Sequence, residues 1–302
     1  MDQQLLAFVT VADEQSFTRA AEKLHISQPA ISQHIQALEQ RLDIKLLDRT
    51  NKYVHLNRAG EVAYHHAREI LSLYSHMTRL IQDLKEEASG TLAIGASFTF
   101  GEYVLPHIIA RFRSQYPKID PTITIANTHT VVEQVSRGEL DIGIVEGHAG
   151  HEGSVEVTAF AEDTVVVVAS SSHPLAAATQ ATAAALEREC WIVREQGSGT
   201  REVTDRVFQE FGIHPSAMIE YGSTQVIKES VEAGLGITLL STWTIRKELT
   251  CQTLKIIPFS KRPITRQFSM VQRKSDFYPK SIQLFTEFLI EESPKLQNIG
   301  QA

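Results

Sequence analysis

The stretch that decides the fold is SFTRAAEKLHISQPAISQHIQALEQRL, which runs from Ser16 to Leu42. Apolar residues recur in it at intervals of three and four, the period of an amphipathic helix. Ser16 and Ser27 each precede such a segment as good N-caps, and Pro29 falls in a first turn, where its missing N–H costs little. Only the tripeptide LHI separates the two helices, so we expect a helix-turn-helix.

The second of these helices carries a stripe of small and amide side chains that a core would not require. In a helix-turn-helix, the first turns of the second helix enter the major groove of DNA. Glutamine can pair with adenine, serine can reach a base edge or a phosphate, and alanine can touch a thymine methyl. The alternative is a three-helix core whose polar faces are merely solvated. The predicted DNA-reading residues are Ser27, Gln28, Pro29, Ala30, Ser32 and Gln33.

The segment DRTNKYVHLNRAG, residues 48–60, alternates apolar and polar residues between turn formers, which predicts a two-stranded wing. Its basic residues Arg49, Lys52 and Arg58 are predicted to contact phosphates, which position a protein without reading sequence. The net charge of the chain is −7, and basic and acidic residues are equal in number over residues 1–60. Charge placement and shape, rather than net charge, must therefore support DNA binding.

Residues 59–87 predict one long helix that contains no proline. A helix of this length has no core of its own to face, so we predict that it pairs with its own copy in a dimer. The alternative is that it packs on a later part of the same chain. Its apolar seam consists of Val62, Ile70, Leu73, Met77, Leu80, Ile81 and Leu84.

From Gly90 onward, short apolar strands alternate with helical segments, which predicts a parallel sheet with crossover helices. A second, similar set begins near Val165, so we predict two lobes. The fold class is therefore α/β, preceded by a winged helix-turn-helix and a long linker helix. The predicted domains are residues 1–58, the linker 59–89 and the bilobed domain 90–302, with lobe I over about 90–162 and 268–302 and lobe II over about 163–267.

Small hydroxyl residues follow several predicted strands and begin the next helices. In open α/β lobes, ligands bind outside the carboxyl ends of the strands, where helix N-termini favour negative charge. Arg201 adds a planar guanidinium that can hold a carboxylate, a phosphate or a sulfur oxyanion. The alternative is that these residues are ordinary caps and that Arg201 pairs with Glu202 or Asp205. The predicted ligand-binding residues are Ser97, Thr99, Thr128, His129, Glu146, Gly199, Thr200 and Arg201.

Other function classes have little support in the sequence. No signal peptide and no apolar run of membrane-spanning length is visible. The two cysteines, Cys190 and Cys251, lack a C-x-x-C spacing and fit a reducing cytoplasm. No nucleophile–base–orienter set appears, so we expect neither an enzyme nor a bound cofactor.

Two histidine-containing segments are predicted not to bind metal. His65 and His66 are adjacent, and adjacent side chains point in different directions on a helix. The glycine-rich segment at residues 147–152 contains His148 and His151 and is predicted to be a loop at the mouth of the cleft.

Residues 17–39 match the string F-x-R-A-A-x-x-L-x-x-S-Q-P-A-x-S-x-x-I-x-x-L-E. This string resembles the N-terminal signature of LysR-type transcriptional regulators, and the likeness extends over the whole chain. It departs from the family pattern at Gln33, where many members have Arg, and at Leu47, where Phe is usual. Tyr53 occupies a wing position that is often basic. The departures concern the DNA contacts of Gln33 and of the residues around Tyr53.

The resemblance implies a two-lobed effector domain like that of periplasmic binding proteins. It also implies a homotetramer, a dimer of dimers, that bends double-stranded operator DNA and changes the bend when a small molecule binds. RNA polymerase is a further candidate partner of such a regulator. The segment GSGTR at residues 197–201 resembles the branch that controls sulfur or carbon assimilation. Sulfur oxyanions and phosphorylated or carboxylated metabolites are therefore candidate effectors. The rival interpretation is a solute-binding protein with an N-terminal appendage.

Overall fold

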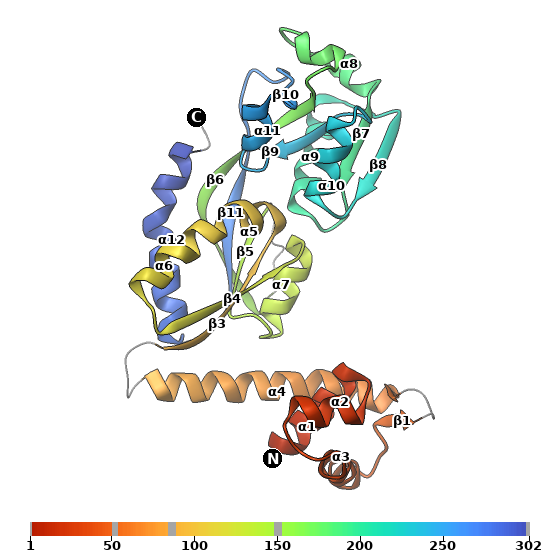
Figure 1. Cartoon of the computed structure of the whole chain (residues 1–302), viewed down its shortest axis with the longest axis vertical. Coiled ribbons are helices and arrows are strands. Elements are labelled where there is room, and N and C mark those ends of the chain that lie inside the picture. Colours follow the sequence, from red (N-terminus) through yellow and green to blue (C-terminus); the bar gives the residue numbers. More distant parts are fainter. Residues whose placement is uncertain (1, 50–53, 84–88, 148–152, 300–302) are drawn as a thin grey trace. The chain divides into compact units, whose positions relative to one another are not determined.

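The computed structural model describes residues 2–49, 54–83, 89–147 and 153–299. Contacts within the chain divide it into two compact units, Met1–Leu84 and Lys85–Ala302. Figure 1 colours the first unit from red to orange and the second through yellow and green to blue. None of the helices in the described part of the chain is both long and apolar enough to cross a membrane.

The first unit is a winged helix-turn-helix followed by a long helix, which confirms the predicted fold class. The hydroxyls of Ser16 and Ser27 accept hydrogen bonds from the backbone N–H groups of Arg19 and Ala30 and so cap two of the helices. The inward residues of the helices, Ile35 among them, share one core. The elements are α1 Asp2–Glu14, α2 Phe17–Lys23, α3 Gln28–Leu42, the antiparallel wing strands β1 Leu47–Arg49 and β2 Val54–Leu56, and α4 Arg58–Asp83.

The helix α4 has two halves of different character. Near its start it packs into the core of the first unit, where Ala67 is 2% exposed. Farther along, Leu73 and Met77 leave 63% and 46% of their surface exposed. Its described end is Asp83, and residues 84–87 of the predicted helix lie outside the described residues.

A buried carboxylate, Glu39, joins α3 to the segment before the wing. It is 4% exposed and accepts hydrogen bonds of 2.9 Å from the backbone N–H of Leu46 and of 2.9 Å from the Lys45 ammonium. Burial by itself raises the pKa of the Glu39 carboxyl, but the bonds from Lys45 and Leu46 outweigh it, and its pKa is lowered from the ordinary 4.5. The ionised carboxylate therefore stabilises the folded first unit.

We expect acid to remove this stabilisation. Because the folded pKa of Glu39 is lowered, its contribution is present above pH 4.5 and declines as the pH falls through the folded value. Urea unfolding followed by circular dichroism at several acidic pH values measures how steeply the free energy of unfolding falls with pH. We expect this slope to be shallower in Glu39→Gln. The exposed Glu22→Gln is the matched control. Equal slopes in Glu39→Gln and the native chain would contradict the prediction.

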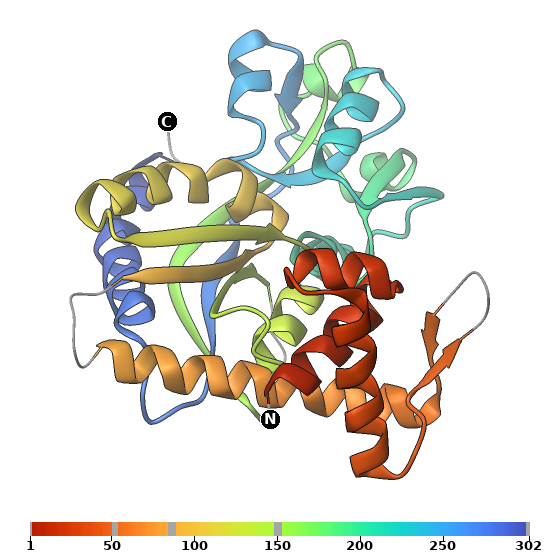
Figure 2. The same ribbon diagram turned by 60° about the horizontal axis from the view of Figure 1, so that its bottom comes forward.

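Lobe I of the second unit is built on three parallel strands. β3 lies between β4 and β5, and Figure 2 shows β3 and β4 running side by side. The sequence predicted one helix after β3, but the structure has two, because Pro106 falls in the first turn of a new helix rather than in the interior of the first. The elements are β3 Gly90–Ala96, α5 Phe98–Tyr103, α6 Leu105–Gln115, β4 Ile119–Ile125, α7 Thr128–Ser136, β5 Ile142–Glu146 and α12 Lys280–Ile299.

Lobe II surrounds Trp191, which is fully buried and donates from its indole to the carbonyl of Leu186 over 2.8 Å. Two strands of this lobe, β7 and β8, pair in parallel. The elements are the 3-10 helix η1 Pro174–Ala177, α8 Ala183–Glu187, β7 Cys190–Arg194, α9 Gly199–Phe211, β8 Ala217–Tyr221, α10 Thr224–Glu232, β9 Thr238–Ser241, α11 Arg246–Cys251 and β10 Leu254–Ile256.

Two long strands, β6 (Val155–Ser170) and β11 (Ile264–Arg273), pass from one lobe to the other. They pair antiparallel over their contact, with a register shift between Phe268 and Ser269. The seven-stranded sheet has the order β10-β6-β11-β5-β3-β4, with β9 also pairing β6. The sequence predicted a parallel sheet and a strand starting near Val165. The structure instead extends that strand back to Val155, because β11 supplies an antiparallel partner along it.

Candidate DNA-reading face and interlobe site

The predicted DNA-reading residues share the outer face of the start of α3. Ile31 and Ile35 are fully buried on the opposite face, which turns the polar residues outward. The Gln28 amide donates to the Ser32 hydroxyl over 3.2 Å. The exposed residues of the set are Ser27, Gln28, Pro29 and Gln33, and the half-buried ones are Ala30 and Ser32.

The predicted phosphate contacts of the wing are only partly described. Arg58 is exposed at the first position of α4, directly after the wing. Arg49 ends β1, but its side chain lies outside the described residues, as do the whole of Lys52 and Tyr53. Of the three basic side chains, the structure therefore describes that of Arg58 alone.

In the second unit, hydroxyl residues gather where the strands of lobe I end. The Glu146 carboxylate, 1% exposed at the end of β5, accepts from the Ser97 hydroxyl and, over 3.4 Å, from the backbone N–H of Thr99. The carbonyl of Glu146 accepts from the Thr128 hydroxyl over 2.9 Å. The helices α5 and α7 thus both begin against one buried carboxylate residue.

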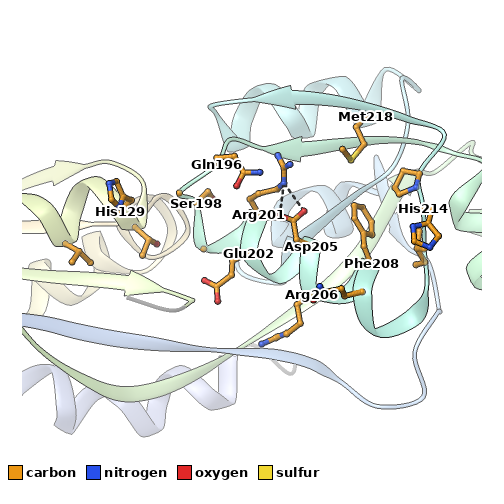
Figure 3. Close-up of a pocket in the computed structure, with 17 residues that line it drawn as sticks. His129, Gln196, Ser198, Arg201, Glu202, Asp205, Arg206, Phe208, His214 and Met218 are labelled. Atoms are coloured by element: carbon orange, nitrogen blue, oxygen red, sulfur yellow. Dashed lines mark hydrogen bonds and ion pairs between the residues drawn. The ribbon is translucent and has the colours of Figure 1, made fainter. Parts of the chain in front are cut away.

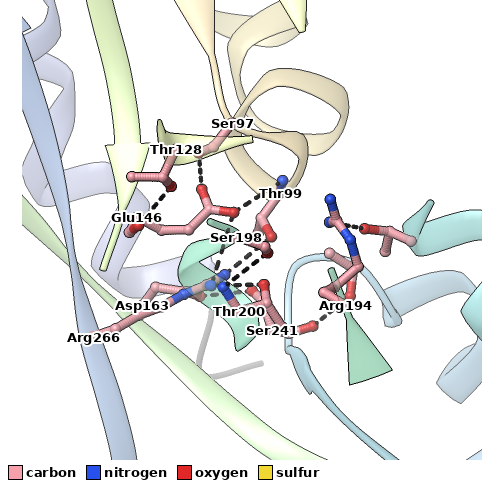
Figure 4. Close-up of polar contacts among 12 residues, drawn as sticks. Ser97, Thr99, Thr128, Glu146, Asp163, Arg194, Ser198, Thr200, Ser241 and Arg266 are labelled. Carbon is pink, nitrogen blue, oxygen red and sulfur yellow. Dashed lines mark hydrogen bonds and ion pairs between the residues drawn. The ribbon is translucent and has the colours of Figure 1, made fainter. Parts of the chain in front are cut away.

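The centre of this cluster is Arg266, a residue that the sequence did not identify. It lies on β11, is 3% exposed, and donates from Nε to Asp163 of the neighbouring strand over 2.7 Å. Its Nη1 donates to the Thr200 hydroxyl of lobe II over 2.9 Å, and its Nη2 donates to the Thr99 hydroxyl of lobe I over 3.0 Å. Figure 4 shows this guanidinium between the hydroxyls of the two lobes.

The charges around Arg266 do not cancel. Its guanidinium lies 2.7 Å from Asp163 and 3.8 Å from a Glu146 oxygen, so two carboxylates share one cation. Burial raises the pKa of the Asp163 carboxyl above its ordinary 3.8, although Arg266 and the hydroxyl of Ser241 both act to lower it. Removing Arg266 would therefore leave two buried carboxylates without a cation.

A sequence signal for Arg266 exists, although its interpretation needs the pairing of the strands. Within the strand segment ITRQFSM, Arg266 and Phe268 are two residues apart and both are buried, so an arginine occupies an inward position. The segment AEDTVVVV likewise places the fully buried Asp163 ahead of an apolar run. Oppositely charged residues at inward positions of two strands are typical of a buried cross-strand pair.

Gly199 lies where the two lobes approach each other closely. It is buried, and a Cβ atom there would overlap the carbonyl oxygen of Glu146. Nearby, the backbone N–H of His129 donates to the carbonyl of Gly197 over 3.1 Å. Because Gly199 has no side chain, lobe II can approach lobe I closely at this point.

The Arg201 guanidinium is paired with two carboxylates of its own chain. Nε lies 2.9 and 3.1 Å from the two oxygens of Asp205, and Nη1 donates to Glu220 over 2.8 Å. Burial by itself lowers the pKa of Arg201, but the bonds to Asp205 and Glu220 outweigh it and raise the pKa. The pair with Asp205, which the sequence offered as the alternative, is therefore present in the structure.

A crevice of about 1050 Å³ borders the buried cluster. Lobe I lines it with Thr128, His129 and Val132, and lobe II lines it with the loop at residues 196–199 and the outer face of α9. Figure 3 shows His129 and Ser198 at one end of the crevice and Phe208 and His214 at the other. Of the predicted ligand residues, Thr99, Glu146 and Thr200 contact Arg266, and Ser97 donates to Glu146. The other four, Thr128, His129, Gly199 and Arg201, line the crevice.

Comparison with known proteins shows the family of the chain. Residues 3–61 match the model of the bacterial regulatory helix-turn-helix protein, lysR family, and residues 85–294 match the LysR substrate binding domain. The HTH-type transcriptional regulator CysL of Bacillus subtilis is 35% identical over 285 residues, which cover 94% of this chain and 95% of that protein. The RuBisCO operon transcriptional regulator of Allochromatium vinosum is 31% identical over 293 residues, 97% of this chain and 96% of its own.

Among solved structures, the regulatory domain of CcmR from Synechocystis, in complex with 2-PG, is similar to the second unit. It has a TM-score of 0.63 and 27% identity, and the match covers 68% of this chain and 98% of that one. The winged helix-turn-helix, the bilobed unit and these matches agree with one another. The chain belongs to the LysR family and is a DNA-binding transcriptional regulator whose second domain responds to a small metabolite.

Proposed function

We propose that the metabolite is a small anion and that it binds between the lobes at the hydroxyl cluster around Arg266. The observation that carries this proposal is that one guanidinium, on a strand connecting the lobes, donates to Thr99 of lobe I and to Thr200 of lobe II. A ligand that competes with Arg266 for the hydroxyl of Thr99 or Thr200 replaces a hydrogen bond that joins the lobes. It thereby shifts the equilibrium between lobe orientations and alters the DNA-bound state.

Two features of the site support an anionic ligand. The start of α9 directs its backbone N–H groups and the positive end of its dipole toward the region where Ser198 lines the crevice. The hydroxyls of Thr99 and Thr200, which accept hydrogen bonds from Arg266, keep their own O–H groups available as donors to the oxygens of a ligand. The similar CcmR domain was solved with 2-PG. Sulfur oxyanions and phosphorylated or carboxylated metabolites are the classes we propose. The proposed regulatory role requires only that the protein bind the metabolite, with no catalytic step.

Thermal stability against a panel of anions tests this proposal. The panel contains sulfite, sulfate, thiosulfate, 2-PG, phosphorylated sugars and dicarboxylates. A ligand that binds only the folded state stabilises it by about 2.7 kcal/mol at a hundredfold excess over Kd. We expect one class to raise the melting temperature selectively, and Thr128→Val to reduce that shift, while the exposed Thr250→Val retains it. The absence of a shift with every anion would reject the proposal.

We propose that the start of α3 reads the operator. For the double variant Gln28→Ala, Ser32→Ala, we expect specific binding to weaken by about 1–3 kcal/mol, because a well-placed glutamine pair discriminates bases by about that amount. Fluorescence anisotropy with operator and scrambled duplexes separates this loss from phosphate binding, which stays unchanged. Gln40→Ala, exposed at the other end of α3, is the control. Unchanged discrimination in the double variant would disprove the assignment of the reading residues.

We also propose that residues 59–89 form the dimerisation segment and that two dimers assemble into a homotetramer. The exposed apolar residues of α4 support this, since a row of aliphatic side chains on a surface helix favours a partner helix. Their exposed fractions reach 63% at Leu73 and 59% at Val62. A second copy of this chain offers the same row. RNA polymerase remains a proposed further partner.

A further inference from the structure

We propose that α4 carries a binding site for a divalent cation of the zinc type, formed by His65, His66 and Glu69. One ligand atom from each of these side chains lies within 4.8 Å of the other two. Neither imidazole belongs to the DNA-reading face or to the interlobe cluster.

Adjacent residues on a helix point in different directions, but Glu69 lies on the helix surface between the directions of His65 and His66 and contacts both. His65 lies one full turn before Glu69, and its Nε2 is 3.4 Å from Oε1. His66 lies three residues before Glu69, and its Nδ1 is 3.0 Å from Oε2. The two imidazole rings meet edge to face with centroids 5.3 Å apart. Both nitrogens therefore approach one carboxylate, which removes the geometric objection to a metal pair.

The set of donor atoms defines the class of cation. Two imidazoles and one carboxylate are ligands of Zn²⁺ and neighbouring transition ions, whereas Mg²⁺ and Ca²⁺ prefer oxygen ligands throughout. Metal–ligand distances of about 2.0–2.2 Å place the donor atoms of a tetrahedral ion roughly 3.4 Å apart. His65 Nε2 and His66 Nδ1 lie 3.4 and 3.0 Å from different oxygens of Glu69, so the side chains must rotate to bring both nitrogens and one oxygen to that spacing. The side chains are 47–63% exposed, so small rotations suffice to complete it.

His66 lies within the exposed apolar row of α4 that is proposed to pair with a second copy of this chain. Val62, one turn before it, and Ile70, one turn after it, are both exposed aliphatic residues. His66 thus occupies a place where the helix otherwise presents apolar side chains. Neither neighbour offers a polar atom that would compete with a cation for the imidazole.

Isothermal titration of the full chain with Zn²⁺, after treatment with EDTA and dialysis, tests the site. We expect one ion per chain at this site. We expect Glu69→Gln and His66→Ala each to weaken its binding by about tenfold or more, because each removes a ligand. His107→Ala, which removes an exposed histidine from α6, is the matched control and retains binding. All three substitutions replace exposed side chains, and circular dichroism verifies that each variant folds.

A second measurement uses Cu²⁺ as the probe, because its electron paramagnetic resonance spectrum reports nitrogen ligands. Splitting from two nitrogens in the native chain, reduced to one in His66→Ala, supports the site. Unchanged Zn²⁺ binding in both Glu69→Gln and His66→Ala overturns it, as does the absence of Zn²⁺ binding to the native chain.

Discussion

Replacing Arg266 with alanine is expected to lower the free energy of unfolding of the effector domain by about 3–5 kcal/mol. The guanidinium is 3% exposed and lies 2.7 Å from Asp163, which is fully buried. Its loss would leave Asp163 and Glu146 as buried carboxylates that face each other without a cation. Urea titration followed by tryptophan fluorescence measures the effect in this domain, because both tryptophans of the chain, Trp191 and Trp243, belong to it.

Two further variants distinguish charge compensation from lost packing. Arg262→Ala removes an exposed arginine close in sequence, and we expect it to change stability by no more than about 0.5 kcal/mol. The double variant Arg266→Ala, Asp163→Ala is expected to be more stable than Arg266→Ala alone, because one of the two uncompensated carboxylates is gone. Arg266→Ala as stable as the native chain would show that the cluster is not charge-coupled.

Replacing Gly199 with alanine is expected to separate the two lobes at the start of α9. A Cβ atom at this position would overlap the backbone carbonyl of Glu146, and backbone atoms cannot move aside as a flexible side chain can. We expect a loss of about 1–3 kcal/mol of stability, as for overpacking in a close-packed interior. Faster hydrogen exchange at the backbone N–H groups of residues 199–202 would locate the opening.

The control for this change is Gly222→Ala in the same lobe, where an added Cβ has nothing within 4 Å. We expect its stability to stay close to that of the native chain. The Gly199→Ala variant should also lose the thermal shift produced by the effector, since the hydroxyls of Thr99 and Thr200 no longer face one cation. A variant that keeps both native stability and the effector shift would refute the close-approach argument.

The sequence by itself determined the features that depend on neighbouring residues. Helix spacing and the capping serines Ser16 and Ser27 act within a few residues, so the helix-turn-helix and the outward face of α3 could be predicted from one short stretch. The residues after the strand ends could also be singled out, since Ser97 and Thr128 begin helices directly after strands. The tip of the wing, residues 50–53, lies outside the described residues.

Only the tertiary structure decided which of these residues act together. Arg266 receives its partners from positions 66, 103 and 167 residues away, and no local pattern encodes contacts of that range. The same holds for Gly199, whose function depends on the carbonyl of Glu146, and for Arg201 of α9, which forms an ion pair with Glu220 of β8. Caps and helix faces follow from steric and hydrogen-bonding preferences along the chain. The interlobe site follows from strand pairing, which brings distant segments together.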